Sequence, residues 1–599
     1  MNAVRSEGQP LDPTLVSVLS HRLDAIVREM TNTLFRTGRS AVLNTAKDFS
    51  CSIVTAEDEL LASVEGLQIH VFGAGLQTPW MHRYHDDVAE GDAFLHNDPY
   101  LGNTHTADHT LLVPVFADGE HVFTACAKAH QADCGNSQAS TYMPFAKDVY
   151  EEGGLQFPCV RVQRGFEDVD DVMRMCRRRI RVPEVWYGDY LATLGAARVG
   201  ERRLKEVVAR YGAGTLRQFS RDWLDYSERR MEAAVRRLPR VRLEGNGLHD
   251  PLPGLPDGIP VKVSIDVDPD AAMIDVDLRD NPDCVPVGVN LSEACTLAGV
   301  VIGVFNCIGA DVPRNAGSFR RLRVQMRENC VAGIPRFPAS CSMATTNVVN
   351  RLINATQAAF AEIGDGWGLA DGGISMGVGF SVVSGTDARR GDAPFVNQLL
   401  LGNNGGPASP RCDGWITYGL PDCAASIYHD SIEVIEHKYP LLVRSARLLA
   451  DSGGAGRFRG GPASEVVFGP SGNAMMAYYF ADGAVEPPSG VRGGNAGLGA
   501  SAAILRVDGS REPIHPLGGS ELTPGEFILG VECGGGGYGD PLERETERVL
   551  EDVLEGWVGR AAAESVYGVI IRDDERGEPT VDLEATQAQR KRQRQEGSA

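Results

Sequence analysis

The sequence predicts an α+β fold, and three observations support this class. Residues 12–36 carry an apolar side chain every three or four positions, which is typical of one face of an amphipathic helix. Residues 51–130 contain short apolar runs separated by polar turns. Residues 259–281 alternate apolar and polar side chains on both sides of Asp-Pro-Asp, the pattern of a β-hairpin. Helices and strands in separate stretches of chain favour the α+β class.

Composition limits the classes of function. The chain has 599 residues, 43% hydrophobic and 23% charged, so we expect most of it to fold. Its 58 basic and 80 acidic residues give a net charge of −22, which repels polyphosphate and argues against a nucleic-acid partner. The sequence contains no run of 18 apolar residues, and its N-terminus lacks the apolar segment of a signal peptide. We therefore expect no membrane span and a cytoplasmic location. Thirteen cysteines without a C-x-x-C pair indicate reduced thiols.

The elements of the first half follow from local patterns. Asp12 can cap the first helix, and Pro13 suits its first turn. Residues 184–238 mix apolar positions with many arginines and glutamates, which predicts helices, and the charged run RRMEAAVRR is interpreted as a solvated helix face. Apolar stretches rich in small residues predict further helices between 290 and 364.

The second half is rich in glycine. Most of the excess among the 69 glycines lies beyond residue 365, where short apolar runs alternate with glycine clusters, so we expect strands joined by tight turns. An open alternative is that SGGAGRFRGG, residues 452–461, presents backbone N–H groups and Arg457 or Arg459 to an anion. No G-x-x-x-x-G-K-[ST] motif occurs, so we expect no ATP site of the P-loop type. An acidic helix over 545–559 and a frayed polar tail over 587–599 are predicted to end the chain.

These changes of pattern divide the chain into five regions. We expect an N-terminal α+β region with the metal site described below (1–165), a helical segment (166–250), a β-hairpin and helical core region (251–365), a glycine-rich β-containing region (366–545), and a C-terminal helix with a polar tail (546–599).

Histidine is crowded into one short stretch. Eight of the thirteen histidines fall between residues 70 and 130. Two His-x-x-Asp motifs occur there, in HNDPYLGNTHTADHT and in AKAHQADCGN. Imidazole nitrogen with carboxylate oxygen suits a divalent ion such as zinc or manganese, and three protein ligands leave positions for water or substrate. We predict one such ion on His105, Asp108 and His130. The open alternative is a polar β-surface of capping aspartates and hydrogen-bonded histidines.

Four neighbouring residues are candidates for acid–base catalysis. Metal-bound imidazoles commonly donate their second N–H to a carboxylate or carbonyl, and a proton must be moved in most hydrolytic reactions. The candidates are Asp133, His109, Asp98 and His70. Cys134 is interpreted as an inert core cysteine rather than a nucleophile.

Several motifs together resemble the hydantoinase B/oxoprolinase family, which includes the large metal-bearing subunits of acetone and acetophenone carboxylases. They occur in the family's order, and the resemblance extends from residue 13 to about residue 575. The motifs are HNDPYLGNTHTADHT, AKAHQADCGN, DVYEEGGLQFPCVRV, LGAARVGERRL, DSGGAGRFRGG and GGGGYGDPLER. The resemblance implies one large multi-layer subunit with mixed and antiparallel sheets and a glycine-rich β-containing C-terminal half.

The resemblance also implies ligands and partners. It implies a divalent metal held by the T-H-x-x-D and A-H-x-x-D segments, which here supply His105, Asp108 and His130. It implies a hydantoinase A-like partner that binds ATP and Mg and phosphorylates the substrate, which agrees with the missing P-loop. This chain has Gly-Asn-Thr-His where Gly-Gly-Thr-His is more frequent, and Cys-Gly-Asn where many members have Val-Gly-Gly, so the surroundings of the substrate are expected to differ.

Two enzyme functions and one non-enzyme function follow as hypotheses. The leading hypothesis is an ATP-dependent cyclic-amide hydrolase of the hydantoinase or 5-oxoprolinase type, in which the metal activates water and Asp133 or His109 manages the proton. The alternative is a subunit of an ATP-dependent ketone carboxylase that uses bicarbonate. The stretch VWYGDYLATLGAARVGE resembles family members near the carboxylases and keeps this alternative open. A small third subunit encoded beside the chain would favour the carboxylase. The third is a metal-stabilised assembly scaffold.

Overall fold

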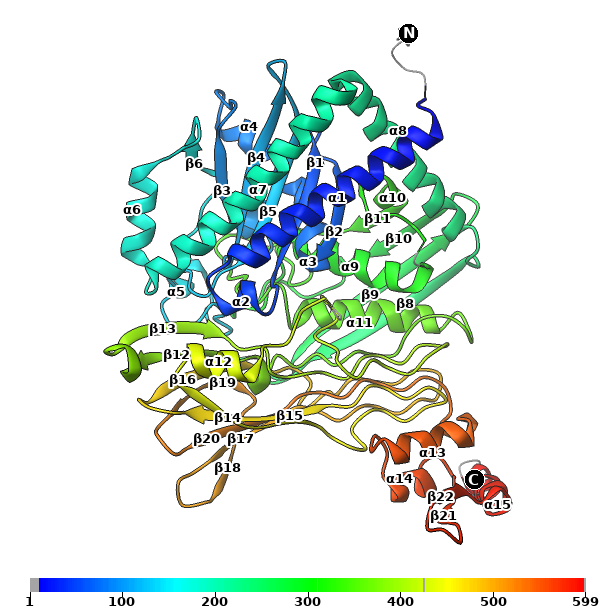
Figure 1. The fold of residues 1–599 in the computed structure, drawn as a ribbon. Helices are drawn as coiled ribbons and strands as arrows, with labels where there is room; N and C mark the ends of the chain where they lie inside the picture. The colour runs from blue at the N-terminus through cyan, green and yellow to red at the C-terminus, as the bar shows by residue number, and fades with distance from the viewer. Residues whose placement is uncertain (1–9, 310, 424–425, 597–599) are drawn as a thin grey trace.

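The computed structural model describes residues 10–309, 311–423 and 426–596 and confirms the α+β class. Figure 1 shows the N-terminal sheet and its helices at the top, a second sheet with two central helices in the middle, and the glycine-rich C-terminal half below them. A small helical unit at the C-terminus projects at the lower right of that view. Among the described residues, no helix has the length and apolar character needed to cross a bilayer.

The N-terminal sheet has seven strands in the order β2-β1-β5-β4-β3-β6-β7, and every neighbouring pair is antiparallel. The first five strands lie in or beside the apolar runs of residues 51–130, whereas the last two lie beyond them and were not predicted. They are β1 (Phe49–Thr55), β2 (Leu60–Gly66), β3 (Ala93–His96), β4 (Asp108–Ala117), β5 (Glu120–His130), β6 (Val160–Arg164) and β7 (Glu167–Asp168).

Long helices cover one face of this sheet. The helix α1 (Pro13–Thr37) packs beside α7 (Pro183–Tyr211), and α7 lies across β4 and β5 (Figure 1). The Asp12 side chain accepts a hydrogen bond from the backbone N–H of Thr14 at 2.7 Å, which confirms the predicted cap. The helix α8 (Ala213–Val235) confirms the helical prediction for the following stretch.

The predicted hairpin forms the middle of the second sheet, which has the order β11-β10-β9-β8. Its strands are β8 (Val241–His249), β9 (Ile259–Asp268), β10 (Met273–Asp277) and β11 (Leu322–Gln325), and only the β10–β11 pair is parallel. Two helices from the predicted 290–364 stretch, α9 (Glu293–Ile308) and α11 (Val348–Ala361), pack against each other beside it.

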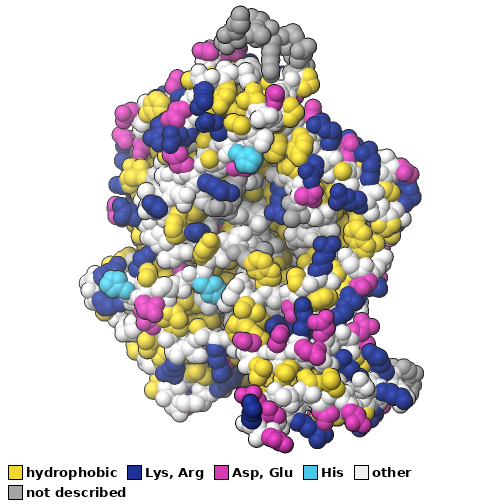
Figure 2. Space-filling view, turned by 45° about the vertical axis from the view of Figure 1, so that its right-hand side comes forward, with side chains coloured by type: hydrophobic (Ala, Val, Ile, Leu, Met, Phe, Trp, Pro, Cys, Tyr) yellow, Lys and Arg dark blue, Asp and Glu magenta, His cyan; other side chains and the backbone are white. Residues whose placement is uncertain are grey.

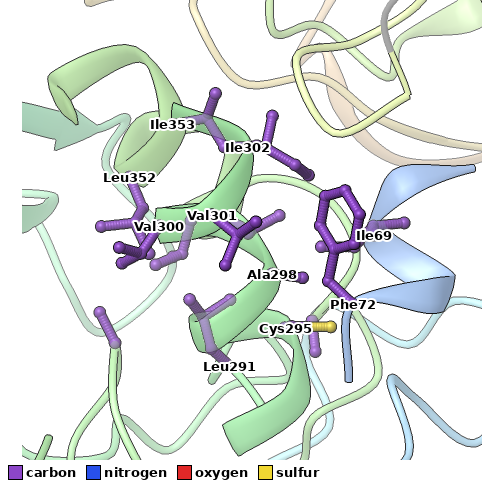
Figure 3. Close-up of a cluster of buried hydrophobic side chains, with 14 of the residues drawn as sticks. Ile69, Phe72, Leu291, Cys295, Ala298, Val300, Val301, Ile302, Leu352 and Ile353 are labelled. Carbon is purple, nitrogen blue, oxygen red and sulfur yellow. The ribbon is translucent and has the colours of Figure 1, made fainter. Parts of the chain in front are cut away.

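A short helix is fixed against this core. Figure 3 shows Ile69 and Phe72 at α3 (Gln68–Val71) packing toward α9. Both side chains are buried, as are Ala298 and Val301 of α9. Because Ile69 and Phe72 hold α3 on α9, the intervening residue His70 is held in a fixed position as well.

Two sheets build the C-terminal half. The four-stranded sheet has the order β13-β12-β16-β19 and the five-stranded sheet the order β14-β15-β20-β17-β18. Their strands are β12 (Val382–Asp387), β13 (Ala393–Gln398), β14 (Leu441–Leu448), β15 (Ser464–Pro470), β16 (Met475–Phe480), β17 (Ser501–Leu505), β18 (Arg511–Ile514), β19 (Leu517–Leu522) and β20 (Phe527–Val531). Short helices elsewhere are α2 (Ala41–Asn44), α4 (Pro79–Tyr84), α5 (Val149–Glu152), α6 (Asp170–Arg179), α10 (Ala316–Phe319), α12 (Ile432–Lys438), η1 (Ala74–Leu76), η2 (Pro99–Leu101), η3 (Val378–Phe380), η4 (Ala388–Arg390) and η5 (Pro541–Glu543).

The glycine clusters are not only tight turns between strands, as the sequence suggested. They form long segments outside the named strands that run side by side (Figure 1) and exchange backbone hydrogen bonds. The N–H of Gly535 donates to Gly461 O at 3.0 Å, and the N–H of Gly454 donates to Gly535 O at 2.8 Å. A Cβ on Gly535 would lie 2.0 Å from Gly406 O, so glycine is needed for close backbone approach.

The same packing argues against an anion site at residues 452–461. Backbone N–H groups of this stretch donate to neighbouring glycine-rich segments. Arg459 donates to the Asp552 carboxylate at 2.9 Å, and Arg457 donates to Asp365 at 2.6 Å. Both arginines and several backbone N–H groups of this stretch are therefore engaged within the fold.

The chain ends in a small unit of α13 (Thr546–Leu554), α14 (Arg560–Ser565), β21 (Ile571–Asp573), β22 (Pro579–Val581) and α15 (Leu583–Glu596). The helix α13 confirms the acidic helix. The prediction of a frayed tail is wrong up to residue 596, because α15 is tied to its neighbours: the Arg590 guanidinium donates to Tyr567 O at 3.0 Å and Arg544 O at 2.7 Å. Residues 597–599 of that predicted tail lie outside the described residues.

We expect Arg544→Met to destabilise this end of the protein. The Arg544 side chain is buried and donates to the carboxylates of Asp413 and Asp552. Its loss removes the cation that these two acids share and leaves Asp552 paired with Arg459 alone, at a cost on the order of 3 kcal/mol. Limited proteolysis should cut within residues 545–596 faster than in the wild type. Arg548→Met is the control, because the Arg548 side chain is 43% exposed and lies 3.8 Å from Asp413. Equal cleavage of the two variants would contradict the expectation.

On the face shown in Figure 2, basic and acidic side chains are interspersed rather than gathered into patches of one sign. Acidic side chains therefore do not form a single patch on this face.

Candidate metal centre

Strand register brings the three predicted ligands together. Asp108 begins β4, His130 ends β5, and these two residues are direct partners in the antiparallel pair. Side chains of direct partners lie on the same face of a sheet with Cβ atoms about 5 Å apart. His105 precedes the strand by three residues, and its loop returns its side chain to Asp108.

The three side chains form a compact group that we call the triad: His105, Asp108 and His130. Asp108 Oδ1 lies 3.1 Å from His105 Nε2 and 3.1 Å from His130 Nδ1. One ligand atom from each residue lies within 4.8 Å of the others. All three residues are at most 1% exposed.

The outer nitrogens of both imidazoles are engaged elsewhere. His105 Nδ1 donates to Ser342 O at 2.8 Å, which leaves the lone pair on Nε2, the nitrogen that faces Asp108. His130 Nε2 hydrogen-bonds Thr141 Oγ1 at 3.2 Å, which leaves Nδ1 to face Asp108. Buried His105 Nε2 has no hydrogen-bond partner among the described residues. In metal-binding histidines one ring nitrogen faces the ion and the other is held by a hydrogen bond. His105 and His130 have this arrangement around Asp108, so the residues fit a divalent ion.

The charge distribution agrees with a cation-binding centre. Burial acts to raise the pKa of Asp108, but the surrounding imidazoles of His105 and His70 hold it well below its usual range. Burial lowers the pKa of His130 to about 4, so its imidazole is neutral at pH 7. For His105, burial is outweighed by the Asp108 carboxylate, which raises the pKa.

Two further side chains meet at the triad. His70 Nε2 lies 3.2 Å from Asp108 Oδ2, so the structure places this candidate at the site. Asp48, which sequence reasoning missed, lies directly before β1, and its Oδ1 is 3.7 Å from His70 Nε2. That oxygen is buried and has no hydrogen-bond partner among the described residues. Asp48 stands in no spacing motif, and only the pairing of β1 with β5 brings it here.

His109 points away from the triad. Successive residues of a strand face opposite sides of the sheet, so Asp108 and His109 cannot share a face. His109 Nδ1 accepts a hydrogen bond from Trp186 Nε1 of α7 at 3.3 Å, and burial lowers its pKa to about 3. We conclude that His109 belongs to the helix-covered side of the sheet.

Asp98 and Asp133 hold backbone in place. The Asp98 carboxylate caps η2 by accepting from the N–H of Tyr100 at 2.9 Å. The Asp133 carboxylate accepts from the backbone N–H groups of Gly135 and Arg181, and Arg181 also pairs with it through its guanidinium at 3.2 Å. Both contact sets fit structural roles. Cys134 is buried, with a pKa raised well above its usual range, as its interpretation as a core cysteine requires.

A cavity of about 30 Å³, room for about one water molecule, adjoins the triad. Its lining combines both halves of the chain, since it includes Asp48, His70 and His130 as well as Gln398 and Asp422. Asp422 is 4% exposed, and burial raises its pKa to about 7. It is the second functional candidate that the sequence did not indicate.

Residues 373–377 read G-x-S-x-G, a spacing that also occurs in serine hydrolases. Ser375 is buried and donates to Glu532 Oε2 at 2.5 Å. The segment lies among the glycine-rich segments rather than between a strand and a helix. Ser375 therefore lacks the context of a nucleophile.

We expect acid to destabilise the fold through His96, another histidine of the 70–130 stretch. Its Nε2 donates to Leu101 O and its Nδ1 accepts from Cys159 N–H, so the fold holds it neutral, and burial lowers its pKa to about 4. The unfolded chain, with a pKa near 6.5, binds the proton first as pH falls. The contribution of neutral His96 to the free energy of unfolding is therefore complete above pH 6.5. It falls by about 2 kcal/mol by pH 5.

Urea unfolding at pH 7.5 and pH 5 measures this loss in the wild type and in His96→Asn. The variant should lose about 2 kcal/mol less stability between the two pH values. The same loss in both proteins would contradict the assignment.

The fold and the site together describe a large α+β chain with a buried centre of two histidines and one aspartate. The model of the family described as hydantoinase B/oxoprolinase matches residues 12–541, and the chain belongs to this family.

Several known proteins are similar over nearly the whole chain. The caprolactamase subunit beta of Pseudomonas jessenii is 32% identical, covering 97% of this chain and 99% of that protein. The crystal structure of the ATP-dependent caprolactamase from Pseudomonas jessenii matches with a TM-score of 0.88 at 30% identity, covering 97% of this chain and all of that one. The acetophenone carboxylase delta subunit of Aromatoleum aromaticum is 24% identical, covering 93% of this chain and 86% of that protein.

Proposed function

We propose that this chain is the metal-binding catalytic subunit of an ATP-dependent cyclic-amide hydrolase. The observation that carries the proposal is the buried triad of His105, Asp108 and His130, which adjoins a small cavity lined by both halves of the chain. Similarity to a caprolactamase subunit over nearly the full length supports hydrolysis of a cyclic amide.

The triad would hold one zinc or manganese ion, and Asp48 offers a fourth, unpartnered oxygen nearby. When bound, such an ion supplies Lewis acidity and makes water more acidic. His105 and His130 are held for this task by Ser342 and Thr141, which fix their ring orientations.

His70 is the residue we propose for proton transfer. Its Nε2 contacts the triad at Asp108, its Nδ1 is buried without a hydrogen-bond partner among the described residues, and burial lowers its pKa. A neutral imidazole at the edge of the cavity can accept a proton from water and return it to the leaving nitrogen. Asp133, His109 and Asp98 do not take this role, since each is engaged in the contacts described above.

ATP and Mg would be bound by a hydantoinase A-like partner. The sequence has no P-loop lysine, and the similar caprolactamase is ATP-dependent and has a subunit called beta. The partner would phosphorylate the amide oxygen. Phosphorylation removes the resonance stabilisation of the amide and activates its ring carbon for attack by water.

A ketone carboxylase is the second candidate, because the delta subunit of an acetophenone carboxylase is also similar over most of the chain. That function would use the same triad to polarise a ketone, with bicarbonate as the carbon source and a small third subunit as a further partner.

The purified complex, given ATP, decides between the two. We expect ring opening of a lactam with ATP consumption and no incorporation of labelled bicarbonate into a ketone. Incorporation with a ketone, in the absence of amide opening, would overturn the hydrolase proposal.

A further inference from the structure

The loop that carries His105 and Asp108 is closed by the side chain of Asn103. Asn103 Nδ2 donates to His105 O at 2.8 Å and to Asp108 O at 3.0 Å. Its Oδ1 accepts from Thr110 Oγ1 of β4 at 3.1 Å, so the carboxamide is itself held in place. Asn103 is fully buried, and loss of its side chain would leave buried carbonyl groups without these donors. The Asn103 side chain therefore fixes the backbone of two triad residues relative to each other.

The two oxygens of the Asp108 carboxylate have different neighbours. Oδ1 lies 3.1 Å from His105 Nε2 and 3.1 Å from His130 Nδ1. Oδ2 accepts a hydrogen bond from Thr104 Oγ1 at 2.5 Å and lies 3.2 Å from His70 Nε2. Because the hydrogen bond from Thr104 holds Oδ2, Oδ1 is the oxygen that is turned toward the two imidazoles of the triad.

A buried lysine sets the direction of the Thr104 hydroxyl. Lys128 Nζ donates to Thr104 Oγ1 at 3.3 Å. An ammonium group can only donate, so the hydroxyl hydrogen of Thr104 is left to point at the Asp108 carboxylate. Lys128 is 3% exposed and Thr104 is fully buried, so water does not compete for this chain of hydrogen bonds.

We propose that Asn103 and Thr104 are positioning residues of the metal centre, and that Asp108 binds the ion through Oδ1 alone. The inference rests on the metal site of the proposed function but does not depend on which reaction the ion serves. Asn103 holds the backbone of the ligands, and Thr104 holds Oδ2 away from the ion. One oxygen from Asp108 and one nitrogen from each histidine make three protein ligands, which leaves room for water or substrate. A carboxylate that bound through both oxygens would occupy part of that room.

The first test measures the Kd of zinc for the full chain by competition with a chelator. Thr104→Val keeps the shape of the side chain but removes the hydroxyl, and we expect zinc to bind about 10- to 100-fold more weakly. Thr104→Ser keeps a hydroxyl, and its Kd should stay within about threefold of the wild type. A wild-type Kd in Thr104→Val, or equal losses in the valine and serine variants, would overturn the role of Thr104.

The second test removes the side chain that closes the loop. Asn103→Leu removes both N–H donors at nearly constant volume and should weaken zinc binding at least about tenfold. Asn281→Leu is the matched control, because Asn281 is 3% exposed and its Nδ2 donates to Lys262 O and Leu278 O, both at 2.8 Å, outside the metal centre. The control should lower the stability of the fold and leave the Kd of zinc unchanged. Equal weakening by the two leucine variants would overturn the role of Asn103.

Crystals of the zinc-loaded chain test how Asp108 binds. We expect the zinc to be bonded to Oδ1 only, with Oδ2 still accepting from Thr104. Zinc bonded to both oxygens of Asp108 would overturn the inference. Zinc bound with equal affinity by the wild type, Thr104→Val and Asn103→Leu would disprove the inference and leave the metal site of the proposed function intact. A wild-type chain that binds no zinc would disprove both.

Discussion

Asp108→Asn should abolish metal binding by the chain. Asp108 is the centre of the site, because its two carboxylate oxygens face His105, His130 and His70 at 3.1–3.2 Å. Asparagine preserves the shape but removes the anionic oxygen that a divalent ion requires. After dialysis, we expect elemental analysis to find about one zinc or manganese per wild-type chain and less than about 0.1 in the variant, with turnover by the complex lowered at least about 100-fold.

Two histidines of β5 give a second test and its matched control. His130→Gln should lose the metal, whereas His121→Gln should keep it, because His121 lies at the far end of β5 and contacts His82 and Thr124. Metal bound at wild-type levels by Asp108→Asn would contradict the site. A different outcome would favour the scaffold hypothesis. In that case metal loss would dissociate the complex, and the fraction that stayed assembled would keep full turnover.

Gly535→Ala should destabilise the C-terminal half severely. A Cβ there would lie 2.0 Å from Gly406 O and 2.6 Å from Gly406 C, and both are backbone atoms that cannot rotate away. The N–H of Gly535 also donates to Gly461 O, so a shift of the segment would break that hydrogen bond. We expect a loss of about 3 kcal/mol or more, measured as a lower thermal midpoint or as loss of folded protein.

Gly472→Ala is the control, because a Cβ at this position meets nothing within 4 Å. It should change stability by less than about 0.5 kcal/mol. Equal stability of Gly535→Ala and the wild type would show that the glycine-rich segments do not approach as closely as described here.

Local patterns predicted the elements that depend on local chemistry. The first helix begins at Pro13 after the Asp12 cap, and the hairpin at 259–281 became β9 and β10. The triad could also be predicted from the sequence. His105 and Asp108 are close in sequence, and the short turn after β4 returns the chain along β5 to His130. His109 could have been excluded as well, since it follows Asp108 directly on a strand.

Long-range packing determined what the sequence did not show. Asp48 and Asp422 reach the cavity from positions more than 300 residues apart, and neither stands in a motif. The glycine clusters were interpreted as turns because glycine is frequent in turns, whereas here its missing side chain permits backbone segments to touch. A contact between distant backbones leaves no periodic signal in the sequence.

Anomalous diffraction from crystals of the zinc-loaded chain tests the central claim most directly. We predict one anomalous peak about 2.0–2.2 Å from His105 Nε2, Asp108 Oδ1 and His130 Nδ1. A single peak bound by other side chains, or no peak at the triad in a chain that retains zinc, would contradict the assignment of this site.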